Sequence, residues 1–253
     1  MIRDLIVILI GALLVHCSTP LEDSDTDMAL IEVSKSKKGK GENGSPINPF
    51  LIDKREVAIA QFKQFVDETG YVTDAEKKDG GSLVFQHPET IYKEGPNWRC
   101  DESGNPRDEK DYHYPVIHVS FNDATAYAKW ASKRIPTKEE WEAAAYYLQS
   151  VQKGPPRMDE MAWNMENARA RVQPPGSKLS NGMGVYDLFG NVGEYVIIGA
   201  PKKLPNGVVC TVGIKGGSIW LDEEFFTIER MIYTTEISPS FYTGFRCVKD
   251  IPK

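Results

Sequence analysis

The stretch NGMGVYDLFGNVGEYV, residues 181–196, combines carboxylates and turn residues more densely than any other part of the chain. Asp187 and Glu194 flank a glycine-bearing turn, where carboxylates and main-chain carbonyls can converge. Calcium takes roughly six to eight oxygen ligands of these two kinds. One interpretation is a calcium site made of the side chains of Asp187 and Glu194 and the carbonyls of Gly190 and Val192. The other is a hydrogen-bonded turn in which both carboxylates accept from backbone N–H groups, and the spacing alone favours this second interpretation.

The segment before this turn, PVIHVSFNDATAYAKWASKRIPTKEEWEAAAYYLQ (residues 115–149), predicts a strand, a helix, a turn and a second helix. Ser120 or Asn122 is a suitable N-cap for the first helix, and Thr137 and Glu140 have the capping-box spacing for the second. One face of the second helix is interpreted as core, and it carries Trp141, Ala144, Ala145 and Leu148.

The folded domain is predicted to begin at residue 49. FLIDKREV (residues 50–57) suits a strand, and AIAQFKQFVDETG (residues 58–70) has helical apolar spacing that ends at Gly70. A long irregular stretch, residues 71–114, follows. Two helices flanked by short, irregular antiparallel strands predict an α+β domain with high loop content over residues 49–253.

The first residues predict export. Leu5–Val15 is an apolar run that is too short to span a bilayer but fits the apolar core of a signal peptide over residues 1–16. Cys17 follows it and resembles the lipidated cysteine of a bacterial lipobox, although His16 departs from that pattern. The alternative is an ordinary signal peptide with a chance cysteine. Residues 17–48 are predicted to be a polar tether, with a short strand near 28–33.

The charge and composition of the chain limit the classes of partner that it is expected to bind. The net charge is −6 and no long basic run is interleaved with aromatic residues, which argues against a nucleic-acid partner. The cysteines after Cys17 are Cys100, Cys210 and Cys247, and their odd number leaves the pairing open. The four histidines show no ligand pattern, and His118 is interpreted as a structural residue on a strand.

Five stretches, in order, resemble the formylglycine-generating enzyme family, also called sulfatase-modifying factor domains. They are FLIDKREVAIAQFKQFVDETGYVTDAEK, PVIHVSFNDATAYAKWASKRIPTKEEWEAAA, NGMGVYDLFGNVGEYV, KGGS and GFRCV, and together they span residues 50–248. The resemblance implies an irregular variant of the C-type lectin fold. It also implies a structural calcium at Asp187, Gly190, Val192 and Glu194, and a second calcium at Asn167 and Ala168, whose later aspartate has no counterpart here.

The same resemblance locates the catalytic position after Gly216, Gly217 and Ser218. Family enzymes oxidise a substrate cysteine with O₂, using copper held by two cysteines that follow this turn. The corresponding residues here are Leu221 and Phe226, which carry no sulfur, and thiolates are the ligands that Cu(I) selects. We therefore expect no copper and no copper oxidase activity.

Two other uses of this segment remain open. Ser218, Asp222, Glu223 and Glu224 are candidate catalytic residues of an atypical oxidoreductase or other enzyme that uses the groove after Gly217. Alternatively, Trp220 and Tyr242 form a surface that binds an envelope protein or a glycan. We expect the second: a calcium-braced, lipid-anchored envelope protein of bacteria. An active formylglycine-generating oxidase would require cysteines from elsewhere in the chain.

Overall fold

The structure is a computed structural model that describes residues 27–32, 46–151 and 158–252. The signal peptide predicted for residues 1–16 and the predicted lipidation site Cys17 lie outside these ranges. Within them, no helix has both the length and the apolar character that crossing a membrane requires.

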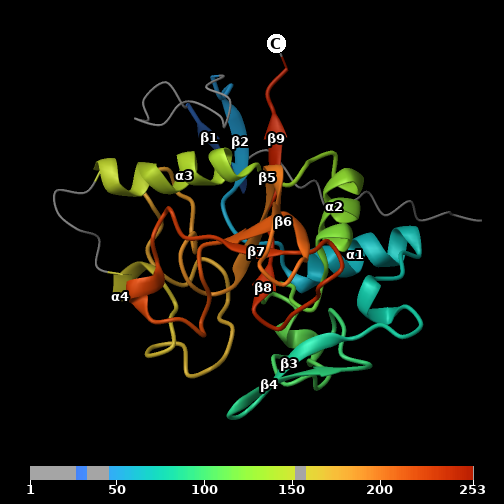
Figure 1. Cartoon of the computed structure of the whole chain (residues 1–253). Coiled ribbons are helices and arrows are strands. Elements are labelled where there is room, and N and C mark those ends of the chain that lie inside the picture. Colours follow the sequence, from blue (N-terminus) through green and yellow to red (C-terminus); the bar gives the residue numbers. More distant parts are fainter. Residues whose placement is uncertain (1–26, 33–45, 152–157, 253) are drawn as a thin grey trace, which may run out of the picture.

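Three sheets organise the described residues (Figure 1). The first has the order β1-β2-β9 and is antiparallel; its strands are Met28–Ile31, Phe50–Asp53 and Val248–Asp250. The second is the antiparallel pair β3 (Ser82–Gln86) and β4 (Glu89–Lys93). The third has the order β7-β6-β5-β8, with strands Ile232–Thr234, Val209–Lys215, Gly193–Lys203 and Thr243–Gly244.

The strand predicted near residue 28 is part of the domain. β1 pairs with β2 along its whole length, and Ala29 and Ile31 are buried in the same core cluster as Phe50 and Ile52. This part of the predicted tether therefore belongs to the folded domain, because its alternate apolar side chains have a sheet to pack on.

Four α-helices lie in the described ranges, two more than the fold-class prediction counted. They are α1 (Ile59–Thr69), α2 (Phe121–Trp130), α3 (Lys138–Val151) and the single turn α4 (Met158–Met161). α1 buries Ile59, Phe62 and Phe65, and Gly70 ends it in the left-handed conformation with φ 66°. This conformation costs glycine little because it has no Cβ.

The predicted caps of α2 and α3 are confirmed. Ser120 Oγ accepts a hydrogen bond from the Asp123 N–H at 3.1 Å. At α3, the Thr137 N–H donates to the Glu140 carboxylate at 2.9 Å, and the Glu140 N–H donates to the Thr137 hydroxyl at 3.2 Å. α3 lies next to the β1-β2-β9 sheet in Figure 1, and its Trp141, Ala144 and Ala145 are fully buried in the core. The side chain of Leu148 is outside the description.

Residues 71–114 contain a hairpin that the sequence analysis missed. β3 and β4 pair over five residues each and extend away from the body at the bottom of Figure 1. The alternation of SLVFQ was the available signal, since Ser82 and Val84 are buried while Leu83 and Phe85 are partly exposed. β4 is mostly exposed and carries no such alternation.

The strand predicted at residues 115–119 is wrong. Pro115 makes an isolated bridge to Ala58, and His118 has a φ of 58°, which no strand residue adopts. The chain turns here because the His118 ring is anchored on both sides: Nδ1 lies 2.7 Å from Ser82 Oγ, and Nε2 lies 2.8 Å from the carbonyl oxygen of Asp101. The carbonyl can only accept, so Nε2 carries the proton and donates it. His118 is therefore structural, as expected, but it joins the start of β3 to the loop at Asp101 rather than lying on a strand.

Because the His118 ring is buried, we expect the folded protein to lose stability in mild acid. Burial lowers the pKa of His118 from 6.5 to about 4. Between these pH values the unfolded chain binds a proton that the folded chain does not, so the free energy of unfolding decreases as the pH falls through the window. The whole shift corresponds to a loss of about 3 kcal/mol.

Urea unfolding at several pH values measures this loss. The matched variant is His118→Asn, because asparagine tolerates the left-handed backbone. We expect the wild type to lose more stability than the variant between pH 6.5 and 4. An equal dependence on pH in both proteins would contradict the assignment.

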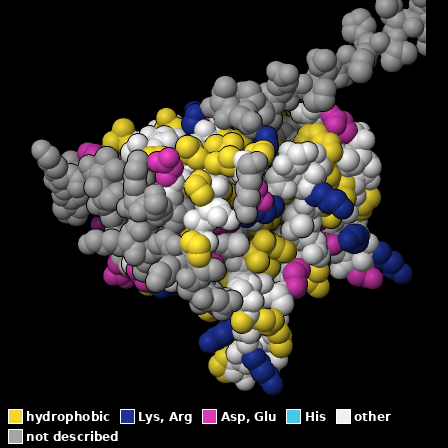
Figure 2. Space-filling view, turned by 90° about the horizontal axis from the view of Figure 1, so that it is seen from above, with side chains coloured by type: hydrophobic (Ala, Val, Ile, Leu, Met, Phe, Trp, Pro, Cys, Tyr) yellow, Lys and Arg dark blue, Asp and Glu magenta, His cyan; other side chains and the backbone are white. Residues whose placement is uncertain are grey.

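Charged side chains are mixed over the face seen in Figure 2. Lys and Arg side chains are interspersed there with Asp and Glu, with hydrophobic side chains between them.

Cys100, Cys210 and Cys247 are all buried, and none of these three forms a disulfide.

Candidate functional site

At the Gly216–Ser218 turn the backbone lies close to neighbouring residues. Gly216 and Gly217 have φ of 85° and 77°. A Cβ on Gly216 would lie 2.6 Å from the Leu188 carbonyl oxygen, and one on Gly217 would lie 2.6 Å from the Phe226 ring. Both positions therefore require glycine for two reasons, conformation and space.

Leu221 and Phe226 fill the space in front of this turn. Phe226 is 4% exposed and its ring lies 6.5 Å from that of Phe189, centroid to centroid. Leu221 packs against the same core cluster. Both side chains reach the position of a Gly217 Cβ, Leu221 Cδ1 at 3.5 Å and Phe226 Cδ1 at 2.7 Å. The structure brings the two positions together, and their surfaces are hydrocarbon.

The candidate catalytic residues after the turn do not form a common site. Ser218 is 4% exposed, and its Oγ accepts a 3.4 Å hydrogen bond from the Trp220 N–H. Asp222 precedes a short 3₁₀ helix that carries Glu223 and Glu224, both of which are exposed. Among the described residues, Ser218 makes no hydrogen bond to any of the three acids. Within the described part of the chain, Ser218 thus lacks the hydrogen bond to these acids by which a base would activate a nucleophile.

The two aromatic residues predicted to form a surface belong to one aromatic cluster: Phe85, Trp220, Phe241 and Tyr242. The Trp220 ring lies 3.9 Å from Phe85 and 5.2 Å from Phe241, and Tyr242 lies 5.1 Å from Phe241, all between centroids. Trp220 and Tyr242 are half-buried, so part of each ring remains accessible. Phe85 comes from the hairpin that the sequence analysis missed.

The Asp187–Glu194 turn is built from left-handed residues. Asp187, Gly190 and Asn191 have φ of 52°, 77° and 50°. Asp187 is 2% exposed; its Oδ2 accepts a 2.6 Å hydrogen bond from the Gly176 N–H, whereas its Oδ1 is buried without a hydrogen-bond partner. Burial raises the pKa of Asp187 to about 6. One carboxylate oxygen thus supports the turn, and the other makes no hydrogen bond within the described residues.

Glu194, the second predicted carboxylate ligand, is held by Arg246. The guanidinium donates to both oxygens, at 2.6 and 2.7 Å, and the Trp141 indole N–H donates to Oε2 at 2.8 Å. Both side chains of this ion pair are almost completely buried. Arg246 belongs to the GFRCV stretch, so the turn is tied to the C-terminal segment by a bidentate pair.

Glu56 lies beside this turn and was not a candidate in the sequence analysis. It is 2% exposed, its Oε1 accepts from Asn191 Nδ2 at 3.1 Å, and its Oε2 is buried without a hydrogen-bond partner. Burial raises the pKa of Glu56 well above its usual range, and the Asp187 carboxylate raises it more than Glu194 does. The sequence offers little reason to select it, because Glu56 follows the charged residues Lys54 and Arg55 just after a strand.

The carboxylates of this region do not form a ready-made ligand cluster. Over the described ranges, no three His, Cys, Asp or Glu side chains converge as a metal site would need. At the second predicted calcium position, both named oxygens accept hydrogen bonds. Asn167 Oδ1 accepts from the Asn164 N–H at 2.9 Å, and the Ala168 carbonyl accepts from Gln173 Nε2 at 3.1 Å.

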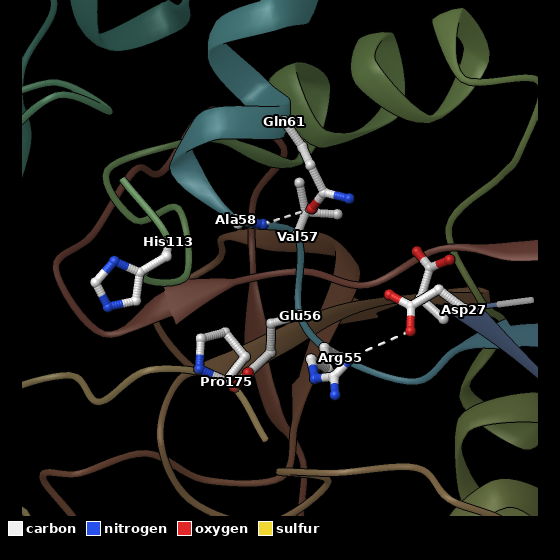
Figure 3. Close-up of a pocket in the computed structure, with 9 residues that line it drawn as sticks. Asp27, Arg55, Glu56, Val57, Ala58, Gln61, His113 and Pro175 are labelled. Carbon is white, nitrogen blue, oxygen red and sulfur yellow. Dashed lines mark hydrogen bonds and ion pairs between the residues drawn. The ribbon is translucent and has the colours of Figure 1, made fainter. Parts of the chain in front are cut away.

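A pocket of about 230 Å³ opens next to Glu56 (Figure 3). Its lining includes Arg55, Glu56, Gln61, His113 and Pro175. In Figure 3, Glu56 lies between Arg55 and Pro175, and Arg55 is paired with Asp27 at 3.0 Å on the accessible side. The pocket thus provides a path from solvent to a buried carboxyl group.

Comparison with known proteins finds a matching family model and relatives that cover most of the chain. The model of the sulfatase-modifying factor enzyme 1-like domain matches residues 3–251. The chain is 30% identical to a formylglycine-generating enzyme of Thermomonospora curvata over 81% of this chain and 83% of that protein. It is also 32% identical to an inactive C-alpha-formylglycine-generating enzyme 2 of Mus musculus, over 79% of this chain and 75% of that protein.

Among solved structures, PvdO from Pseudomonas aeruginosa has a similar fold. The TM-score is 0.57 at 18% identity, with 88% of this chain and 90% of that chain covered. The α+β, C-type-lectin-like fold expected from the sequence is confirmed.

Proposed function

Because the chain belongs to the sulfatase-modifying factor enzyme 1-like family, we propose that it is a member without copper oxidase activity that binds a protein or glycan partner in the cell envelope. The single observation that carries this proposal is the hydrocarbon surface of Leu221 and Phe226 in front of Gly217. Copper held by two thiolates has no ligand there, since neither side chain has a donor atom. One relative of this chain is itself named inactive.

A binding role is supported by the aromatic cluster. Trp220 and Tyr242 are half-buried and braced by Phe85 and Phe241. Rigid aromatic side chains lose little conformational entropy on binding and dominate many interfaces. The alternative, another enzyme in the groove after Gly217, has less support, because Glu223 and Glu224 are exposed and separate from Ser218.

Calcium and export complete the proposal. A structural calcium at the Asp187 turn is supported by the buried, unpartnered Asp187 Oδ1, since hard oxygen atoms are what this ion takes.

A lipid anchor at Cys17 in the bacterial envelope is supported by the apolar run that precedes it. Fractionation of cells that express Cys17→Ser tests the anchor: the variant should leave the membrane fraction, and retention there would contradict it.

Copper binding and peptide oxidation test the loss of oxidase activity. Reduced protein titrated with Cu(I) should show no stoichiometric tight site, and a cysteine-containing sulfatase peptide should stay unmodified with O₂ and copper. Tight Cu(I) binding that is lost in Cys210→Ser or Cys247→Ser would overturn the proposal.

For the binding role, capture from envelope extracts is compared between wild type and Trp220→Ala, with Tyr92→Ala on β4 as the exposed control. Equal capture by all three proteins would argue against the aromatic cluster.

A further inference from the structure

Asn-Gly is the dipeptide at which an asparagine side chain most readily reacts with its own backbone, because glycine has no Cβ to shield the amide nitrogen that follows. The chain carries it at residues 43–44, 181–182 and 206–207, of which the first pair lies outside the described ranges. The other two pairs have opposite environments. Asn206 is exposed, whereas Asn181 is only 3% exposed. The fold thus gives the same dipeptide two different chances to react.

Asn206 lies at the tip of the hairpin that joins β5 to β6. The loop consists of residues 205–207, and the Leu204 N–H closes it by donating to the Val208 carbonyl at 2.8 Å. Gly207 has a φ of 88°, the left-handed conformation that ends the common three-residue hairpin loop. All three loop residues are exposed. Water therefore reaches the Asn206 amide without any opening of the fold.

The side chain of Asn206 is already turned toward the nitrogen that would attack it. Its Oδ1 accepts a 3.2 Å hydrogen bond from the Val208 N–H. Such an Asx turn brings the side-chain Cγ close to the intervening amide, which is that of Gly207. The Val208 N–H also stabilises the negative charge that develops on Oδ1 during attack at Cγ. The contact that opposes the reaction is the Gly207 N–H bond to the Leu204 carbonyl at 2.9 Å, which must be released.

Asn181 precedes a glycine in the same way, but its amide is fixed at both ends. Its Oδ1 accepts from the N–H groups of Met183 and Val185 at 3.0 and 2.9 Å. Its Nδ2 donates to the Ala144 carbonyl of α3 at 3.2 Å. Nδ2 is the atom that must leave, so this bond has to break before the amide can react. Burial also keeps away the water that completes the reaction. Asn181 is therefore an internal control.

We propose that Asn206 is a site of spontaneous deamidation in the folded protein. The Gly207 main-chain nitrogen attacks Asn206 Cγ, a bond forms between them, and Nδ2 leaves as ammonia with the proton of the Gly207 N–H. Water then opens the resulting cyclic imide at either carbonyl carbon. Opening at Cγ gives an aspartyl residue in the normal chain. Opening at the main-chain carbon gives an isoaspartyl residue, in which the chain runs through Cγ. Water is the only co-reactant.

The reaction changes the charge and the backbone of the hairpin tip. Lys202 and Lys203 are exposed at the end of β5, and residues 199–209 contain no acid. Either product adds a carboxylate next to this basic segment, where opposite charges attract. In the isoaspartyl product the main chain is also longer by a methylene group. The three-residue loop then no longer has the length that its turn geometry requires.

Peptide mapping by mass spectrometry tests the site on the folded full chain, incubated at mildly alkaline pH in water enriched in heavy oxygen. Asn206 should convert to the acid with uptake of heavy oxygen, as aspartyl and isoaspartyl peptides that chromatography separates. Asn181 should convert at about a tenth of the Asn206 rate or less, because its amide gives up three hydrogen bonds before it reacts. In urea, where neither position keeps its native contacts, the two rates should become similar.

Asn206→Gln is the matched variant, since it keeps the amide on a longer side chain that closes a ring on the next nitrogen far more slowly. Its hairpin peptide should take up no heavy oxygen over the same time. A native rate at Asn206 no higher than that at Asn181 would overturn the proposal, and so would conversion that occurs only in urea. Equal uptake by the Asn206→Gln peptide would place the reaction at another residue and overturn it as well.

Discussion

Replacing Arg246 by methionine is expected to lower the free energy of unfolding by about 3–5 kcal/mol. Arg246 and Glu194 form an ion pair whose side chains are 0% and 1% exposed. The substitution leaves the Glu194 carboxylate buried without its cation, and it also removes the donor to the carbonyls of Asp53, Lys54 and Tyr186. The loss is large because a buried charge that is left alone costs far more than the net contribution of the pair.

Chemical unfolding measures the effect, and the chain offers a matched control. Arg134 is paired with Asp250, whose side chain is 74% exposed. Because exposed pairs contribute little, Asp250→Asn should change the free energy of unfolding by about 1 kcal/mol or less. A cost as small in Arg246→Met would contradict the view that this pair holds the Asp187–Glu194 turn to the C-terminal segment.

Replacing Phe226 by alanine is expected to cost about 3–5 kcal/mol of folding free energy. Phe226 is 4% exposed and contacts the Gly217 turn and the Phe189 ring. Its removal leaves a cavity that the rigid glycine turn cannot fill by relaxing. The neighbouring Phe225 is half-buried beneath the Arg230 guanidinium at 4.4 Å, so Phe225→Ala should cost much less.

Urea unfolding of the two alanine variants makes this comparison directly. A large loss in Phe226→Ala with a small loss in Phe225→Ala would mean that the position in front of Gly217 now serves the core. Equal losses in the two variants would indicate that Phe226 is not an essential part of the packing. In that case, core packing would not explain why position 226 holds phenylalanine and not a cysteine.

The helices α1, α2 and α3 could be predicted from the sequence because their determinants are local. Ser120 caps α2, Thr137 and Glu140 cap α3, and Gly70 ends α1, each through bonds within a few residues. The apolar spacing that predicted α1 comes from side chains that the fold buries, among them Phe62 and Phe65. The strand prediction at residues 115–119 failed because His118 is positioned by Ser82 and Asp101, two contacts that no local pattern encodes.

The candidate site also has features that the sequence predicts and features that depend on contacts between distant segments. The glycine turn and the loss of sulfur at Leu221 and Phe226 could be recognised from the residues alone, since a hydrocarbon side chain has no donor atom wherever it lies. The partner of Glu194 could not be recognised. The ion pair with Arg246 joins residues 52 positions apart, and the bond from Asn191 to Glu56 joins residues 135 positions apart.

By itself, then, the sequence determined the family, the three longer helices α1, α2 and α3, and the absence of thiolates at positions 221 and 226. The tertiary structure alone decided that Glu194 neutralises Arg246, and that Glu56 and Asp187 each keep an unpartnered oxygen. The reason is physical. Residue identity and short-range periodicity decide which atoms are present and which segments coil, whereas the cost of a carboxylate depends on its burial and on the nearby charges, which distant segments supply on folding.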